Sequence, residues 1–134
     1  MSGPTAGERI RRGIDAFNAG DHDALLALLS EDVEWKRVDG LPDADGWIHG
    51  REAVREFLRP DVFAAGRIEV LEMVEADDVV LVHGRFHARG AASGIELDVE
   101  TYAVYRVEGE VAVRIENWRH REDAERSSGL RLSS

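Results

Sequence analysis

The chain has 134 residues, 43% of them hydrophobic and 33% charged, which is the length and composition of one globular domain. Its 17 basic and 27 acidic residues give a net charge of −10, which disfavours nucleic acid and anionic membrane surfaces as partners. It contains no cysteine, which excludes disulfides, thiolate metal sites and cysteine nucleophiles.

Two helices are predicted at the start of the chain. Thr5 and Glu8 have the spacing of a capping box, and apolar residues then recur every three or four positions up to residue 17. Asp21 is placed to cap a second, leucine-rich helix, which we expect to end at Ser30. The stretches 1–7 and 127–134 are expected to be loose ends of a single domain that covers residues 1–134.

A short strand, a loop and a third helix are predicted next. Residues 33–36 are typical of a strand, and residues 39–46 are rich in turn formers, which predicts a mobile loop. A third helix should begin after Gly50 and end near Arg59 and Pro60, although Val62 and Phe63 are apolar enough to prolong it. After about residue 67 the sequence predicts strands only.

Alternation of polar and apolar residues sets the register of the first long hairpin. If Arg89 faces Glu96, opposite charges meet across the strands down to Arg85 and Glu100, which predicts an outward polar face. The other face should cover the core. It carries Val80, Val82, Phe86, Leu97, Val99, Thr101, Ala103 and Tyr105.

The last hairpin allows two orientations of its second strand. A two-residue turn at 108–109 would set Arg114 opposite Ala103 and Glu116 opposite Thr101, with both charges facing inward. Alternatively the strand is turned over, which would bury Ile115 and leave both charges in water. In the first orientation an apolar belt remains on the outer face. It consists of Tyr102, Val104, Val113 and Ile115, and a second copy of the chain would cover it.

The element order and several short motifs resemble the SnoaL-like branch of the nuclear-transport-factor-2-like superfamily. The motifs are Phe17–Asp21, Asp32–Trp35, His49–Val54, Val107–Val111 and Ile115–Trp118. The resemblance covers residues 8–130. It implies a cone-shaped α+β fold, in which three N-terminal helices pack in the concavity of a curved, mainly antiparallel sheet around a small-molecule cavity. It also implies a homodimer through the outer sheet face.

The resemblance does not select one activity, because the superfamily includes ketosteroid isomerases, polyketide cyclases, epoxide hydrolases, dehydratases and proteins that only bind. The ketosteroid isomerase pattern needs a tyrosine and two aspartates. The corresponding positions here fall near Gly13, near Lys36 or Arg37, and near Thr101. Steroid isomerisation by that mechanism is therefore disfavoured.

The candidate catalytic residues are Glu116 and Arg114. A desolvated Glu116 on the inner face would move a proton, and Arg114 would stabilise developing negative charge. Arg114 is alternatively a structural partner that fills the cavity as an ion pair. Thr101 would orient the carboxylate of Glu116 or a bound water, or it is simply a strand residue.

The candidate binding residues are mainly aromatic. Trp118 and Trp35 are expected to line the cavity, and Trp47 would join them if the loop over residues 38–48 folds as a lid. Each tryptophan is alternatively a core residue. The remaining candidates are Phe86 and Val82 on the inner face, and His49 before the third helix, for proton transfer or as a surface residue.

No cofactor is predicted. His83 and His87 would lie about 13 Å apart on one strand, too far to share a metal, and there is no P-loop or dinucleotide motif. The sequence has neither a signal peptide nor a membrane span, so we expect a cytoplasmic protein. Its alanine, glycine and arginine content is typical of a GC-rich bacterial genome.

The predicted function is therefore the handling of a small, largely apolar molecule in the cone. One hypothesis adds cofactor-independent acid–base catalysis of the isomerase, cyclase, dehydratase or epoxide hydrolase type. The alternative is a non-catalytic ligand-binding or accessory module that forms a dimer.

Overall fold

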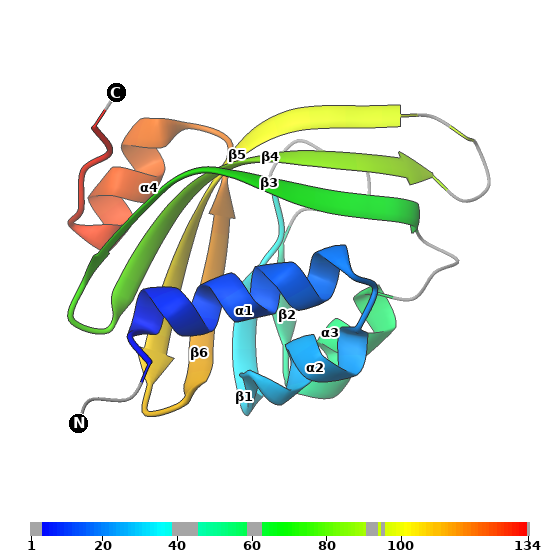
Figure 1. The fold of residues 1–134 in the computed structure, drawn as a ribbon, viewed down its shortest axis with the longest axis horizontal. Helices are drawn as coiled ribbons and strands as arrows, with labels where there is room; N and C mark the ends of the chain where they lie inside the picture. Colours follow the sequence, from blue (N-terminus) through cyan, green and yellow to red (C-terminus); the bar gives the residue numbers. More distant parts are fainter. Residues whose placement is uncertain (1–3, 39–45, 59–62, 91–93, 95, 134) are drawn as a thin grey trace.

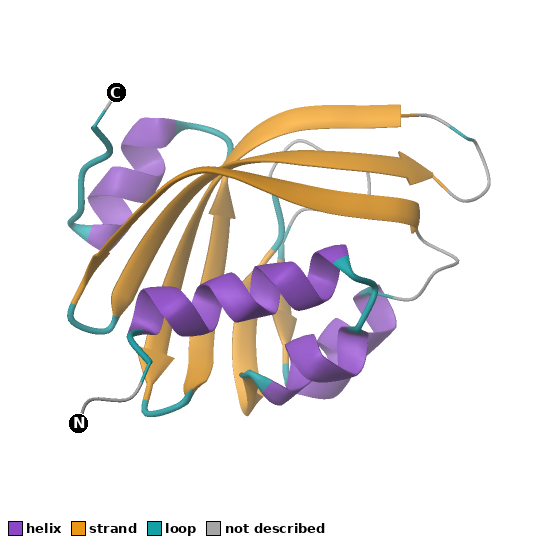
Figure 2. Cartoon of the chain, viewed as in Figure 1, coloured by secondary structure: helices purple, strands orange, loops and turns teal. Residues whose placement is uncertain are grey.

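In the part of the chain that the structure describes, a curved sheet of six strands, in the order β2-β1-β6-β5-β4-β3, separates three helices on its concave face from one helix on its convex face (Figures 1 and 2). The computed structural model describes residues 4–38, 46–58, 63–90, 94 and 96–133. Its elements are α1 (Ala6–Asn18), α2 (His22–Ala27), β1 (Leu29–Lys36), β2 (Trp47–His49), α3 (Arg51–Phe57), β3 (Phe63–Ala76), β4 (Val79–Gly90), β5 (Glu96–Glu108), β6 (Val111–Trp118) and α4 (Arg121–Ser128). β1 pairs in parallel with β6, and the other pairings are antiparallel.

The predicted helix caps are confirmed. The Thr5 side chain accepts a hydrogen bond from the Glu8 backbone N–H at 3.1 Å, and Asp21 accepts one from the Ala24 N–H at 3.1 Å. The second helix was predicted too long, because α2 ends at Ala27 and Leu29 already begins β1. Leu29 pairs with Ala112 of β6 and is 2% exposed, so burial in the sheet overrides the helical tendency of leucine.

The register of the first long hairpin is confirmed. Arg89 lies opposite Glu96, and the pairing continues to His83 opposite Tyr102. The suggestion that Phe63 prolongs the third helix is wrong, since Phe63 begins β3 and pairs with Gly90. The predicted loop over residues 39–46 lies outside the described residues except for its last position.

The turn of the second hairpin lies one residue later than predicted. Glu108 pairs with Val111, so the two-residue loop is Gly109–Glu110, and Gly109 adopts a φ of 62° that favours glycine. This change moves the register by two positions. A shift of two residues leaves every side chain on its predicted face.

A β-bulge in β6 then reverses the faces. Val107 pairs with Ala112, but Arg106 pairs with Arg114, so one extra residue, Val113, is inserted in β6. Glu116 consequently lies opposite Val104 rather than Thr101. The prediction that Arg114 and Glu116 face inward is therefore wrong, because a one-residue insertion sends the following side chains to the opposite face.

The fourth helix was not predicted, because the chain after residue 67 was expected to be strands only. α4 carries a single buried residue, Ala124, and so lacks an apolar stripe. Ala124 packs with Leu81 and Val104 on the convex face, and Leu132 joins the same cluster. The Ser133 N–H and hydroxyl both donate to Glu72, at 2.9 and 2.7 Å.

The C-terminal segment therefore docks on the sheet, and residues 127–133 do not form a loose end. At the N-terminus, α1 begins at Ala6, and Gly7 is buried. Part of the apolar belt that was assigned to a second copy, including Val104, is covered by the chain's own α4, and Ile115 faces the concave side. The homodimer stays a prediction. No helix in the described part of the chain is long and apolar enough to cross a membrane.

Candidate functional site

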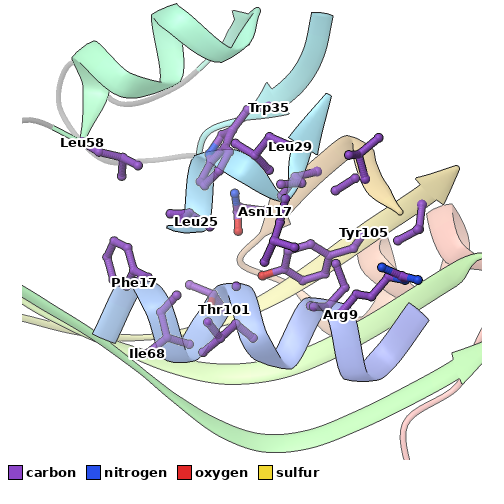
Figure 3. Close-up of a pocket in the computed structure, with 18 of the residues that line it drawn as sticks. Arg9, Phe17, Leu25, Leu29, Trp35, Leu58, Ile68, Thr101, Tyr105 and Asn117 are labelled. Atoms are coloured by element: carbon purple, nitrogen blue, oxygen red, sulfur yellow. The ribbon is translucent and has the colours of Figure 1, made fainter. Parts of the chain in front are cut away.

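A cavity of about 140 Å³ lies between the concave face of the sheet and helices α1, α2 and α3 (Figure 3). Ile14 and Phe17 border it from α1, Leu25 from α2 and Phe57 from α3. Its lining is largely apolar. A cavity of similar size, roughly 150 Å³, is known to take up benzene, so the space suits a molecule of about one ring.

Small residues keep this space open. Gly13 borders the cavity from the middle of α1, and a Cβ there would lie 3.5 Å from side-chain carbons of Leu25 and Leu28. Ala112 borders it from β6 and is 4% exposed. Larger side chains at these two positions would occupy space between the helices and the sheet.

Among the described lining residues, three uncharged polar side chains interrupt the apolar surface. Thr101 and Tyr105 lie on the concave face of β5, and Asn117 lies on β6 opposite Ala103, between them. Figure 3 shows the Tyr105 hydroxyl and the Asn117 side-chain oxygen directed toward the area between Phe17, Leu25 and Thr101. Within the described part of the chain, neither the Tyr105 nor the Thr101 hydroxyl makes a hydrogen bond to the protein.

The protonation state of Tyr105 follows from its surroundings. Burial raises the pKa of Tyr105 to about 12. The phenol is therefore neutral at physiological pH and is able to donate a hydrogen bond into the cavity.

Charged groups border the cavity at its ends. Arg9 of α1 and Glu110 of the β5–β6 turn both border it, with Arg9 Nη2 3.9 Å from Glu110 Oε1. Arg37 borders it beyond the end of β1, and its guanidinium carbon lies 5.7 Å from the centre of the Phe57 ring. Among the described lining residues there is neither an aspartate nor a histidine.

Several predicted binding residues border this cavity. Trp35 of β1, Phe86 of β4 and Thr101 of β5 all line it, as expected from the sequence. Val82 is 2% exposed and belongs to the core cluster on the concave face, but it does not border the cavity.

Glu116, Arg114 and Trp118 do not line the cavity, because the bulge places them on the convex side. Trp118 lies opposite Tyr102 and packs in the cluster under α4. The prediction of Trp118 as a cavity residue is therefore wrong. The alternative prediction was that Trp118 packs as a core residue. It does so beneath α4, a helix that the sequence analysis did not predict.

Glu116 is buried at 5% exposure and is saturated with hydrogen bonds. Arg114 Nε donates to it at 3.0 Å, Trp118 Nε1 donates at 3.4 Å, and the Ser127 hydroxyl of α4 donates as well. Burial raises the pKa of Glu116, but these hydrogen bonds and the charge of Arg114 outweigh it and hold the pKa below its ordinary value. The carboxylate is thus an ionised anchor between β6 and α4.

Trp47 and His49 also lie away from the cavity. They belong to β2, which was predicted as part of a loop, and pair there with Lys36 and Glu34 of β1. The Arg114 guanidinium carbon lies 4.4 Å from the centre of the Trp47 ring, and His49 Nδ1 lies 3.8 Å from Glu34 Oε2. Both side chains are exposed.

The sequence interpretation missed Asn117 and Arg9 as lining residues and did not assign Tyr105 a role. Tyr105 was placed correctly on the inner face, so its long polar side chain was the available signal. Asn117 was hidden by the wrong register of β6. No group of three His, Cys, Asp or Glu side chains that could hold a metal ion occurs among the described residues.

Comparison with known proteins agrees with this geometry. Residues 10–115 match the model of the SnoaL-like domain family. An NTF2-like protein of unknown function from Burkholderia pseudomallei is 27% identical, with 97% of this chain and 100% of that chain covered and a TM-score of 0.76. A proposed polyketide cyclase from Pseudomonas putida is 25% identical over 90% of this chain and 96% of its own, with a TM-score of 0.70.

More distant structures share the fold alone. An LEH-like epoxide hydrolase from Mycobacterium tuberculosis has a TM-score of 0.72 at 14% identity, with 91% of this chain and 88% of that chain covered. No curated protein matches the sequence.

Proposed function

Because the chain belongs to the SnoaL-like domain family, we propose that it binds a small, largely apolar molecule in the cavity between helices α1–α3 and the sheet. The observation that carries this proposal is the cavity itself, about 140 Å³ in volume and bordered by apolar side chains of all three helices. A concave, mostly apolar space with a few polar groups is the usual form of a small-molecule site.

Binding without acid–base catalysis by Glu116 is the form of this function that the geometry favours. The predicted catalytic pair, Glu116 and Arg114, lies on the convex face of the sheet and not among the described residues that line the cavity. Among the described lining residues the only carboxylate is Glu110, whose side chain is 84% exposed at the β5–β6 turn. A carboxylate at an exposed turn is poorly placed to act as a general base on a molecule that is bound in an apolar cavity.

Intrinsic fluorescence tests the proposal, because the tryptophans are divided between the two faces of the sheet. Titration with ethylbenzene and cyclohexanone should quench the emission saturably. The quenching should disappear in Trp35→Phe, whose ring lines the cavity, and persist in Trp47→Phe, whose ring is exposed on the convex side. Quenching that persists in Trp35→Phe would place the bound molecule elsewhere.

A second variant separates binding in the cavity from contact near it. Gly13→Leu adds a side chain from the middle of α1 into the lining and should abolish the saturable quenching. Far-UV circular dichroism would show that this variant is folded. If a folded Gly13→Leu protein bound the probes as tightly as the wild type, the cavity would not be the site.

A further inference from the structure

Three cavity side chains have hydrogen-bonding capacity that the described part of the protein does not use. Neither the Thr101 nor the Tyr105 hydroxyl has a hydrogen-bond partner in that part of the protein, and both residues border the cavity. Buried polar groups in folded proteins are almost always satisfied. Polar atoms left open toward an apolar cavity therefore indicate groups that a bound molecule satisfies.

The direction of the hydrogen bond at Asn117 is fixed by its neighbour. Its Nδ2 donates to the Lys36 carbonyl oxygen at 2.9 Å. The opposite amide orientation would set two oxygens against each other, so the chain itself determines which end faces the cavity. The Asn117 Oδ1 is thus left to accept a hydrogen bond from a ligand. Its direction in Figure 3 agrees with this role.

Tyr105 supplies the complementary group. Its phenol stays protonated in this environment, so the cavity wall offers a donor at Tyr105 and an acceptor at Asn117. The two residues lie on neighbouring strands, with Ile115 between them on β6 opposite Tyr105, and Asn117 two residues further along. Both polar groups therefore border the same cavity.

The charge and the size of the ligand are limited by the rest of the lining. Burying an ion against apolar side chains without a partner is costly, which favours a neutral molecule. Both arginines of the described lining already have neighbours in the chain, because Arg9 lies close to Glu110 and the Arg37 guanidinium lies over the Phe57 ring. A volume of about 140 Å³ accommodates one six-membered ring with short substituents.

From these observations we propose that the ligand is a neutral, monocyclic molecule that carries both a carbonyl and a hydroxyl group, the carbonyl accepting from Tyr105 and the hydroxyl donating to Asn117. The inference rests on the proposed binding function and specifies its ligand class. Thr101, whose hydroxyl both donates and accepts, adds a third contact for a further oxygen.

A set of matched probes tests the class. 4′-Hydroxyacetophenone carries both groups, acetophenone only the acceptor, 4-ethylphenol only the donor and ethylbenzene neither. We expect the first to bind tightest in calorimetric titration at pH 6.5, and the loss of either group to weaken binding about tenfold, as for one buried hydrogen bond. 4-Hydroxybenzoate, which is charged, should bind more weakly than 4′-hydroxyacetophenone.

Variants assign each group to its residue. Tyr105→Phe should weaken 4′-hydroxyacetophenone about tenfold and leave 4-ethylphenol unchanged. Asn117→Leu should weaken 4-ethylphenol and leave acetophenone unchanged. Tyr102→Phe is the matched control, because Tyr102 lies on the same strand but on the convex face, stacked on His83 at 4.6 Å between ring centres.

The outcomes distinguish the two proposals. If ethylbenzene and 4′-hydroxyacetophenone bind equally well, and Tyr105→Phe changes neither, the cavity binds molecules but the ligand class is wrong. Tighter binding of 4-hydroxybenzoate than of 4′-hydroxyacetophenone would also overturn the neutral class. If no probe binds, ethylbenzene included, the proposed function fails together with the inference.

Discussion

Replacement of Glu116 by glutamine tests whether this residue is an anchor of the fold rather than part of the cavity. The carboxylate accepts hydrogen bonds from Arg114, Trp118 and Ser127 at a position that is 5% exposed. Glutamine keeps one acceptor oxygen but turns an NH₂ group toward another donor. At least one hydrogen bond to a charged group is lost, at a cost of about 2 kcal/mol.

This magnitude gives a measurable shift. For a chain of 134 residues, about 2 kcal/mol lowers Tm by roughly 6–10 °C. Urea unfolding at pH 7, followed by circular dichroism and extrapolated linearly, gives the difference in the free energy of unfolding directly. Glu34→Gln is the matched control. Glu34 also pairs with Arg114, at 3.2 Å, but its side chain is 44% exposed, so its loss should cost less than about 1 kcal/mol.

The pH dependence has a definite sign. Because the folded-state pKa of Glu116 lies below the ordinary 4.5, the native state binds this proton more weakly than the unfolded chain does. Its stabilisation is present above about pH 4.5 and is lost as the pH falls through the folded-state pKa. The difference in stability between wild type and Glu116→Gln should therefore shrink below pH 4.5.

Two results would refute this account of Glu116. A variant within about 0.5 kcal/mol of the wild type at pH 7 would show that the hydrogen bonds contribute little. A large loss of affinity for 4′-hydroxyacetophenone in a folded Glu116→Gln protein would place the residue at the cavity, contrary to the register of β6. We expect that affinity to be unchanged.

Three further predictions concern stability, each measured by urea unfolding. Gly13→Ala should stabilise the protein by about 0.5–1 kcal/mol, because alanine favours the helix and its Cβ would make only ordinary contacts. Gly7→Ala should stabilise it less or destabilise it, since the new Cβ would lie 2.6 Å from Glu75 Oε1. Equal gains in the two variants would contradict this reasoning. Thr5→Ala should cost about 1 kcal/mol through loss of the cap of α1, and an unchanged midpoint would contradict the capping role. Ala124→Asp should cost more than about 2 kcal/mol by burying a charge under α4, and a fully stable variant would mean that α4 does not dock as described.

Much of the fold was predictable because its signals are local or strictly periodic. The caps at Thr5 and Asp21 depend on residues three positions apart. The β4–β5 register depends on alternation over many residues, and the charge pairs between Arg89 and Glu96 and their neighbours leave one consistent solution. Patterns of this kind need no knowledge of the rest of the structure.

The candidate site was less predictable, because its composition depends on one inserted residue. Valine is common in regular strands, so the residue type at position 113 does not indicate a bulge. The consequences reach every later position of β6. Asn117 lines the cavity, contrary to the predicted register, and Glu116 and Trp118 lie on the convex face instead.

α4 escaped prediction for a related reason. Its eight residues carry one buried side chain, so the helix is held by tertiary contacts rather than by an apolar stripe. Those contacts include the hydrogen bond from Ser127 to Glu116 and one from Arg106 to the Ser127 carbonyl oxygen at 2.6 Å. Part of the convex side of the sheet is thus covered by a polar helix that forms hydrogen bonds with charged strand residues.

The bulge at Val113 therefore decides which chemistry the cavity can support. Without the insertion, Arg114 and Glu116 would face the helices, and an ion pair would occupy an apolar space at a large desolvation cost. With it, Ile115 and Asn117 face the cavity, and the ion pair meets Ser127 of α4 and the water on the convex side. The same insertion thus places the Asn117 amide rather than the Glu116 carboxylate on the concave face, and it supplies the charged anchor that holds α4 in place.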